Sequence, residues 1–294
     1  MKYSGDSQPL GGSMPRITAS VVLYKTPDSI LRRLIECIES SYSPVKLYII
    51  DNSPTPDKML SINSNLNYFW TGQNCGYGRA HNRALELIEN ESDIHFVLNP
   101  DIYFGPEVLS KIAEKLMGTK DLGLVMPKIV SPNGERQYLC KLLPNPLDLF
   151  SRRFFYGPLK RLFDRRNRRM EMRFADYNTE MEAPFLSGCF MALKTSVISE
   201  IGGFDDRFFM YTEDLDLSRR IHEKYRTLYW PQVAVVHDHQ KASYKNLKMT
   251  WVHIESAIKY FNKWGWFFDR NRKRINLNVV KLALANSKAA VPPS

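Results

Sequence analysis

The stretch His95–Phe104 limits the possible folds more than any other part of the chain. It opens with the apolar run Phe96-Val97-Leu98, which is typical of a buried strand, and it stops at Asn99-Pro100. Proline has no N–H for a sheet ladder and biases the residue before it toward extended geometry, so we predict that the strand ends here. Asp101 then lies at the C-terminal tip of a strand, where open α/β sheets bind ligands. Its carboxylate is either an oxygen ligand for a divalent cation that also holds a diphosphate, or only a turn residue.

The composition is that of an ordinary globular protein with an anionic partner. The 294 residues are 44% hydrophobic and 24% charged, enough for one large α/β domain or two small ones. The formal net charge of +10 favours a nucleotide, a nucleic acid or a lipid surface as partner. The four cysteines contain no Cys-x-x-Cys pair, which argues against a zinc site or a disulfide framework and fits a reducing cytosol.

Residues 1–13 differ from the rest by their polar sequence with Gly, Ser and Pro. They lack the apolar core of a signal peptide, so we do not expect export. We treat them as a disordered tail or a cloning scar outside the fold. No apolar run in the sequence reaches the roughly 18 residues that a bilayer-spanning helix needs.

A second carboxylate is predicted at a strand tip early in the chain. Ile17–Tyr24 and Val45–Ile50 are predicted to be buried strands, with a helix between Pro27 and Glu39. The second strand ends at Asp51-Asn52-Ser53. This tripeptide either forms an ordinary Asx turn or presents Asp51 to a nucleobase or ribose, and spacing alone leaves both open.

A glycine-containing turn within Asn74–Arg83 precedes another predicted helix. Gly76 and Gly78 allow close backbone approach, and a helix N-terminus favours an anion, so the turn is similar to a phosphate cradle. It lacks the full dinucleotide-binding fingerprint. Alternatively, the glycines serve only the geometry of the turn. Arg79 either adds a charge contact to phosphate or is solvated.

An acidic cluster follows Phe185–Leu193, a predicted strand with a glycine at its middle. Thr212 is a plausible N-cap for a helix whose first turn contains Glu213, Asp214 and Asp216. These acids either complement the helix dipole or supply a base in a cleft beside the apolar residues that precede them. Asp216 and Arg220 are four residues apart and are spaced to form a pair.

Two histidines follow the last predicted strands, Arg226–Trp230 and Val233–His237. His237 and His239 lie on the same side of an extended chain, which suits one ligating and one supporting residue. His237 is the expected ligand because it is at the strand tip. A single histidine after a strand is more often structural.

Two segments mix basic and aromatic residues. Phe150–Arg173 contains nine Lys and Arg against two acidic residues, and Trp264–Arg274 ends a predicted amphipathic helix that starts at Met249. Such segments lie on anionic membranes, bind nucleic acid, or form a solvated insertion ordered by a dimer partner. The tail from Ser287 is expected to be loose.

Together these motifs resemble the family 2 glycosyltransferases, and more closely their bacterial rhamnosyltransferase-like branch. The match runs from about Ile17 to Tyr244. The residues that carry it are Val21–Tyr24, Ile49–Ser53, Asn74–Gly78 with His81 and Asn82, Asn99–Asp101, Gly203–Asp214 and His237–His239.

The resemblance implies a GT-A fold, an α/β class with a Rossmann-like mixed sheet flanked by helices and a C-terminal helical, basic extension. The expected parts are a nucleotide-sugar-binding half at 14–130 and an acceptor-binding half at 131–245 with a basic insertion at 150–173. An amphipathic helix and a basic-aromatic tail follow at 246–294. The reaction implied is a metal-dependent transfer with inversion.

The resemblance also implies residue roles. Asp101 and His237 bind Mg²⁺ or Mn²⁺ on the donor diphosphate, and Asp214 is the catalytic base, with Glu213 as the second choice. Asp51 contacts the nucleobase end of the donor. The remaining donor contacts implied are Tyr24, Asn52, Gly76, Gly78, Arg79, Asn82, Asn99 and Lys241.

Two departures from the family pattern bear on the donor site. Asn99 replaces the first acid of the usual metal motif, so the metal site differs from the family pattern at this position. Lys25 stands where the family usually has asparagine, so the donor contact there also differs.

The implied donor is dTDP-L-rhamnose, and the implied acceptor is a polyprenyl-diphosphate-linked saccharide in O-antigen or related polysaccharide assembly. The expected location is cytoplasmic, peripheral on the inner face of the cell membrane, with a possible homodimer and without nucleic acid. Two other classes stay open: a nucleotidyltransferase and a non-enzymatic basic protein that binds membranes or nucleic acid.

Overall fold

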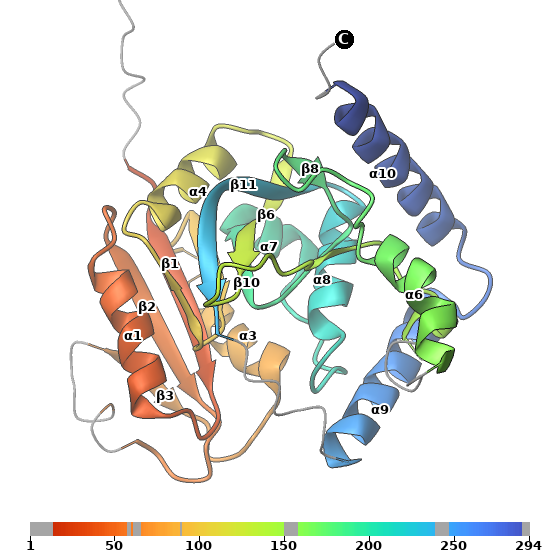
Figure 1. Ribbon diagram of the computed structural model, residues 1–294. Coiled ribbons are helices and arrows are strands. Elements are labelled where there is room, and N and C mark those ends of the chain that lie inside the picture. Colours follow the sequence, from red (N-terminus) through yellow and green to blue (C-terminus); the bar gives the residue numbers. More distant parts are fainter. Residues whose placement is uncertain are drawn as a thin grey trace, which may run out of the picture.

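The computed structural model describes residues 14–57, 60, 66–88, 90–149, 158–238 and 247–289. Within this part of the chain, nine strands form one mixed sheet with helices on both faces (Figure 1). The strand order is β3-β2-β1-β4-β10-β6-β11-β5, and β8 pairs with β11. The strands of this sheet are β1 Ile17–Leu23, β2 Val45–Asp51, β3 Asn67–Trp70, β4 Ile94–Leu98, β5 Ile102–Phe104, β6 Leu122–Val130, β8 Met181–Glu182, β10 Phe190–Lys194 and β11 Arg226–His237.

The first four strands run parallel, as their continuous apolar sequences favour. In register, Leu23 of β1 lies beside Asp51 of β2, and Val21 of β1 lies beside Leu98 of β4. The C-terminal ends of β1, β2 and β4 therefore meet at one edge of the sheet, and the polar residues that follow them are brought together there.

The middle of the sheet is antiparallel and differs in detail from the prediction. Phe185–Leu193 is not one strand: β9 (Phe185–Leu186) pairs with β7 (Cys140–Lys141) in a small second sheet, and β10 starts only at Phe190. Conversely, the two predicted strands before His237 are one strand, β11, with a register shift between Trp230 and Ala234.

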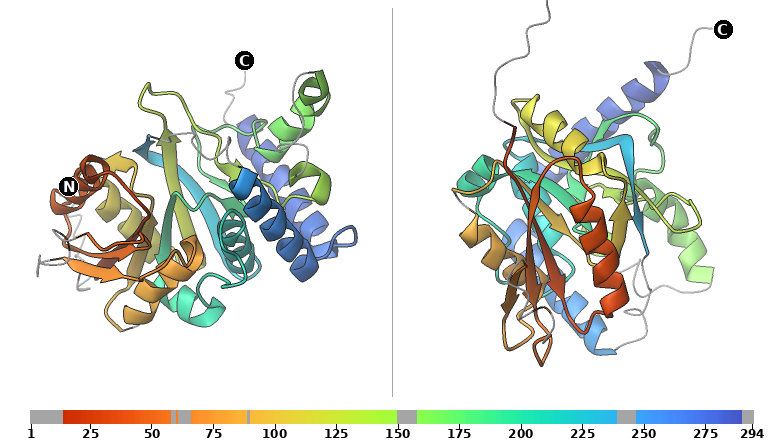
Figure 2. Two further views of the ribbon diagram at one scale, coloured as in Figure 1. Left: turned by 90° about the horizontal axis from the view of Figure 1, so that it is seen from below. Right: turned by 90° about the vertical axis from the view of Figure 1, so that its left-hand side faces the viewer.

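Helices cover both faces of the sheet. Helices α1 (Asp28–Glu39) and α4 (Val108–Met117) lie on one face, and α3 (Tyr77–Leu87) and α7 (Thr195–Ile201) lie on the other (Figure 2). Each helix turns an apolar stripe inward; in α4 this stripe includes Leu109, Ile112 and Leu116, all fully buried.

The C-terminal part is helical: α9 covers Leu247–Trp264 and α10 covers Arg270–Ala289. Helix α10 continues to Ala289, and the expectation that the tail from Ser287 is loose stays a prediction. Tyr260, Phe261 and Ile275 from these helices form a second apolar cluster with Phe208 and Leu215. The helices thus pack against α8 (Glu213–His222), beside the basic helix α6 (Pro158–Met170) (Figure 1).

Among the described residues, no helix is long and apolar enough to cross a membrane.

Candidate active site

Three predicted side chains, from two segments far apart in the sequence, meet at the ends of β4 and β11. His237 Nε2 lies 3.3 Å from Asp101 Oδ1 and 3.4 Å from Asn99 Nδ2. The pairing of β11 with β5 brings His237 opposite Ile102, directly after Asp101. The expected proximity of Asp101 and His237 is therefore present in the fold.

This group fits a divalent cation that also binds a substrate diphosphate. Asp101 Oδ1 is buried, and no described donor is hydrogen-bonded to it. Two ligands about 2.1 Å from a metal at a right angle to each other lie about 3 Å apart, close to the Asp101–His237 distance. The described residues hold no cluster of three or more His, Cys, Asp or Glu that would bind a metal by themselves. Mg²⁺ sites commonly use one or two protein carboxylates and take the remaining ligands from phosphate and water.

The acid pair at the start of α8 lies in the same region. Asp214 Oδ2 accepts a hydrogen bond of 2.9 Å from the Gly188 N–H, and the neighbouring Cys189 carbonyl accepts one of 2.9 Å from the Asn99 N–H. Burial raises the pKa of the Cys189 thiol to about 12, and the charges of Asp101 and Asp214 both add to that shift. Asp214 and Asp101 therefore both lie close to residues 187–189.

The two acids of the pair have different surroundings. Glu213 is 5% exposed and its Oε2 has no hydrogen-bond partner among the described residues. Burial, followed by the charge of Asp214, raises the pKa of Glu213 to about 8. Burial also raises the pKa of Asp214, but the N–H groups of Gly188 and Leu215 donate to its carboxylate and favour the ionised form. Backbone N–H groups of residues 211–213 also favour the ionised form of Glu213, but burial and the charge of Asp214 outweigh them, so the neutral form of Glu213 is favoured.

Lys141 was not predicted from the sequence, yet it belongs to this region. It is 9% exposed in β7, and its ammonium lies 4.6 Å from the centre of the Phe185 ring. Its positive charge opposes the rise in the pKa of Asp214 that burial causes. A lysine in a two-residue strand has no sequence signature, so only the fold could reveal it.

A cleft of about 430 Å³ opens beside Asp51, between the ends of β1 and β2. Asp51 is 2% exposed, and its carboxylate accepts hydrogen bonds from the Tyr68 hydroxyl (2.6 Å) and the Ser53 N–H (2.8 Å). The Asx turn is therefore present. Lys25 lines this cleft in a left-handed conformation with φ of 52°, and Tyr24 beside it is 49% exposed.

The glycines at the start of α3 are explained by packing on the segment before α8. Gly76 has φ of +93°, and a Cβ there would lie 2.4 Å from the Phe209 carbonyl oxygen; a Cβ on Gly78 would lie 2.8 Å from Phe204 Cβ. The Phe209 carbonyl also accepts a 3.0 Å hydrogen bond from the Tyr77 N–H. One of the free N–H groups at the start of α3, which could bind an anion, is thus already hydrogen-bonded within the protein.

The polar residues predicted around this turn bond to the protein. The Asn52 amide donates to the Gly76 carbonyl at 3.0 Å, and the Asn82 amide both donates to and accepts from the backbone of Phe204 at 2.8 Å. Arg79 forms an exposed ion pair of 3.4 Å with Asp206. Lys241 lies outside the described residues. The donor roles of these residues remain predictions.

His81 is also internal to the fold. Its Nδ1 lies 2.7 Å from the Ser20 hydroxyl, which is in turn 2.8 Å from His95 Nε2. Burial lowers the pKa of both histidines, that of His95 to about 3.

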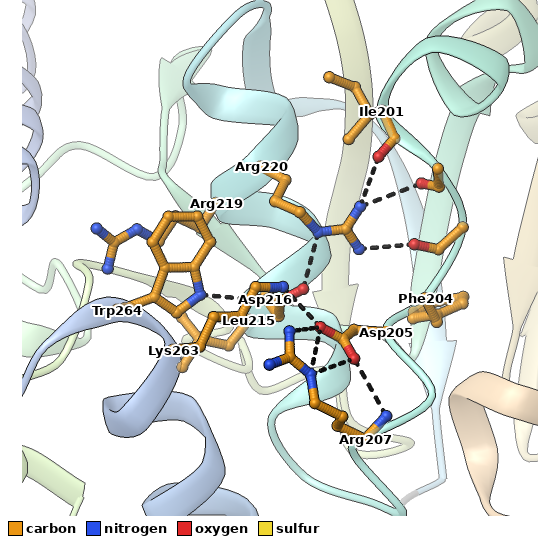
Figure 3. A network of polar contacts seen from close by, with 12 residues as sticks. Ile201, Phe204, Asp205, Arg207, Leu215, Asp216, Arg219, Arg220, Lys263 and Trp264 are labelled. Carbon is orange, nitrogen blue, oxygen red and sulfur yellow. Dashed lines mark hydrogen bonds and ion pairs between the residues drawn. The ribbon is translucent and has the colours of Figure 1, made fainter.

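Helix α8 is held in place by charged contacts on the side away from the sheet (Figure 3). The fully buried Asp216 accepts hydrogen bonds from Arg220 Nε (2.8 Å) and Trp264 Nε1 (2.8 Å) and forms an ion pair of 2.7 Å with Lys263 Nζ. The predicted Asp216–Arg220 pair is confirmed. Thr212 occupies the N-cap position of α8, as expected, but its hydroxyl donates to the Ser256 carbonyl in α9 at 3.3 Å and makes no capping hydrogen bond to the helix.

Comparisons with known proteins agree on one family. The family model described as glycosyl transferase family 2 matches residues 19–202. The N-acetylglucosaminyl-diphospho-decaprenol L-rhamnosyltransferase of Mycobacterium tuberculosis is 26% identical over 245 residues, 76% of each chain. Rhamnosyltransferase WbbL of Escherichia coli is 31% identical over 93 residues, which cover 31% of this chain and 35% of that protein.

Two solved structures share the fold. The mannosyltransferase PcManGT from Pyrobaculum calidifontis, in complex with GDP-Man and Mn²⁺, has a TM-score of 0.53 at 16% identity and covers 99% of this chain and 80% of its own. GalNAc-T7 with UDP, GalNAc and Mn²⁺ has a TM-score of 0.57 at 12% identity, over 95% of this chain and 58% of its own. The fold is therefore GT-A-like, as expected.

Proposed function

This chain belongs to glycosyl transferase family 2, and on that premise we propose that it moves a sugar from a nucleotide-sugar donor onto a hydroxyl group of a lipid-linked saccharide. The observation that carries the proposal is the meeting of the Asp101–His237 pair and the Glu213–Asp214 pair around residues 187–189. One pair suits a cation on the donor diphosphate, and the other suits proton removal from the acceptor.

The proposed donor is dTDP-L-rhamnose and the proposed acceptor is a polyprenyl-diphosphate-linked saccharide. Both the Mycobacterium and the Escherichia relatives are named as rhamnosyltransferases, and the first name includes a decaprenyl diphosphate sugar. Residues 14–130, with the cleft at Asp51, would bind the donor, and residues 131–245 would bind the acceptor.

The chemistry of transfer follows from charge. Asp101 and His237 would hold a divalent cation, which would supply positive charge against the negative charge that develops as the nucleoside diphosphate departs. Asp214 takes the proton of the acceptor hydroxyl while that oxygen attacks the sugar carbon, in one displacement with inversion. Asp214 suits this role better than Glu213, because Glu213 carries its own proton at neutral pH.

An enzymatic assay of Asp214→Asn tests the proposal. Labelled dTDP-L-rhamnose and a polyprenyl-diphosphate-linked N-acetylglucosamine are incubated with wild type, Asp214→Asn and, as a surface control, Asp164→Asn. Loss of a general base predicts a rate about 100- to 10,000-fold lower in Asp214→Asn, with unchanged donor affinity in calorimetry and full activity in the control.

Product analysis decides the reaction class in the same experiment. A glycosyl transfer releases the nucleoside diphosphate, whereas a nucleotidyl transfer would release diphosphate. Wild-type turnover by Asp214→Asn would remove Asp214 from the mechanism. A thermal-shift screen of nucleotide sugars, with and without Mn²⁺, would identify the donor if dTDP-L-rhamnose fails.

A further inference from the structure

We propose that Gln137 is a positioning residue that fixes the proton of the neutral His237 ring on Nδ1, so that the lone pair of Nε2 faces Asp101. The inference deepens the proposed function, and it rests on that function only for the role of the cation site. Nothing in the sequence around Gln137 marks it: the segment 131–139 simply connects β6 to β7.

Gln137 contacts both ends of His237 with its side-chain amide. Its Nε2 donates to the His237 carbonyl oxygen at 2.8 Å and to the Ser131 hydroxyl at 3.1 Å. Its Oε1 lies 3.1 Å from His237 Nδ1. The backbone N–H of Gln137 donates to the Ile129 carbonyl at 2.9 Å, which anchors the residue beside β6.

These contacts determine the tautomer. A backbone carbonyl can only accept, so the amide nitrogen of Gln137 must be the atom that faces the His237 carbonyl. The amide oxygen then faces Nδ1, and because this oxygen also only accepts, Nδ1 must carry the proton. A neutral imidazole has one N–H, so Nε2 is unprotonated.

The unprotonated Nε2 is what keeps the Asp101–His237 site open to a cation. Nε2 lies 3.3 Å from Asp101 Oδ1 without a hydrogen bond to it, and Asn99 Nδ2 lies 3.4 Å from Nε2. Two electron-rich atoms thus face each other. In the other tautomer, an Nε2–H would donate to Asp101 Oδ1, and this bond would occupy both metal-binding atoms.

Near-isosteric variants on two glutamines test the inference. Gln137→Met removes both hydrogen bonds to His237 at a similar side-chain volume. Gln137→Glu keeps an oxygen that can accept the hydrogen bond from Nδ1–H. Gln232→Met is the matched control, because Gln232 is an exposed residue of the same strand as His237. Nitrogen-15 NMR of the metal-free proteins at pH 8 reads the tautomer, with the His237 signals assigned by their loss in His237→Asn.

We expect protonated Nδ1 and unprotonated Nε2 in wild type, Gln232→Met and Gln137→Glu, and a mixture of tautomers in Gln137→Met. Mn²⁺ affinity, read by electron paramagnetic resonance of the free ion, should fall about 10- to 100-fold in Gln137→Met only. A proton on Nε2 in the wild-type protein, or equal Mn²⁺ affinities of Gln137→Met and Gln232→Met, would overturn the inference. Absent sugar transfer with the expected tautomer and Mn²⁺ binding would count against the proposed function alone.

Discussion

At the scale of single residues, Glu213 and Asp214 look interchangeable in the sequence but have different surroundings in the structure. Glu213 and Asp214 are neighbours at the start of α8, but Glu213 points into the protein, whereas Asp214 receives two backbone N–H groups. Burial therefore protonates one acid, and hydrogen bonding favours ionisation of the other. The dependence of the free energy of unfolding on pH should therefore reveal the protonation of Glu213.

Glu213→Gln should flatten the pH dependence of stability. The pKa of Glu213 is raised from its ordinary value to about 8 in the folded state, so the folded protein binds more protons than the unfolded chain between about pH 4.5 and 8. Wild-type stability from this group is fully present below that range and is lost as the pH rises through 8. Relative to Glu213→Gln, wild type should lose up to about 1.4 kcal/mol per pH unit between pH 6 and 8.

Urea unfolding at pH 6, 7, 8 and 9 measures this difference. Glu255→Gln, which changes an exposed acid on α9, should keep the wild-type profile. Parallel profiles for wild type and Glu213→Gln would mean that Glu213 is ionised throughout.

At the scale of elements, α8 is the part that the rest of the molecule holds in place. It carries Glu213 and Asp214 at its first turn, and its outer side is fixed by the contacts of Asp216 (Figure 3) and by those of Arg219. Arg219 is 1% exposed and bonds both oxygens of Asp269, at 2.7 and 3.0 Å, just before α10. The C-terminal helices therefore set the position of the acid pair.

Asp216→Ala should be strongly destabilising, because it leaves Arg220 and Lys263 in a buried site without their shared carboxylate. Removing one partner of a buried ion pair costs about 3–5 kcal/mol. The matched control is Asp164→Ala in α6, which breaks an Asp–Arg pair of the same i,i+4 spacing with both side chains exposed. The control should change stability by less than about 0.5 kcal/mol. Denaturant unfolding compares the two, and equal losses would show that burial of the network adds nothing.

At the scale of the whole molecule, the turn between α9 and α10 presents two aromatic side chains to solvent. Phe267 is 74% exposed and Phe268 is 96% exposed. The basic helix α6 and the basic start of α10 lie on the same side of the molecule as this turn, opposite β1–β3 (Figures 1 and 2). Basic and aromatic groups together suit an anionic lipid surface, where a lipid-linked acceptor would be found.

Replacing both Phe267 and Phe268 with serine should weaken binding to anionic vesicles at least about tenfold. Burying one phenyl ring is worth about 1.5–3 kcal/mol, and 1.4 kcal/mol is a factor of ten. Vesicle co-sedimentation at low salt measures the effect, with Tyr42→Ser plus Phe69→Ser as a control on the opposite side, where both rings are also exposed. Failure of the wild type to bind anionic vesicles at low salt would contradict membrane docking.

The sequence by itself determined the strand ends, the acid pair and the family. Leu98-Asn99-Pro100-Asp101 ends a strand for local reasons, since proline removes a ladder donor wherever it falls. Apolar periodicity located most helices, because an amphipathic stripe is a property of one segment. Motif order identified the family that the comparisons confirm.

Only the tertiary structure decided which partner each polar group has. From the sequence, Gly76 and Gly78 were expected either to cradle phosphate or to serve only the geometry of the turn. The structure adds that a Cβ at these positions would lie too close to Phe209 and Phe204, from the segment before α8. Gln137 and Lys141 have no recognisable sequence pattern. Their importance comes from their neighbours in the fold: Gln137 contacts His237, and the charge of Lys141 acts on Asp214. The physical reason is that a strand end or a helix stripe is set by neighbouring residues, whereas a buried hydrogen bond or charge depends on which distant segment the folded core brings within about 3 Å.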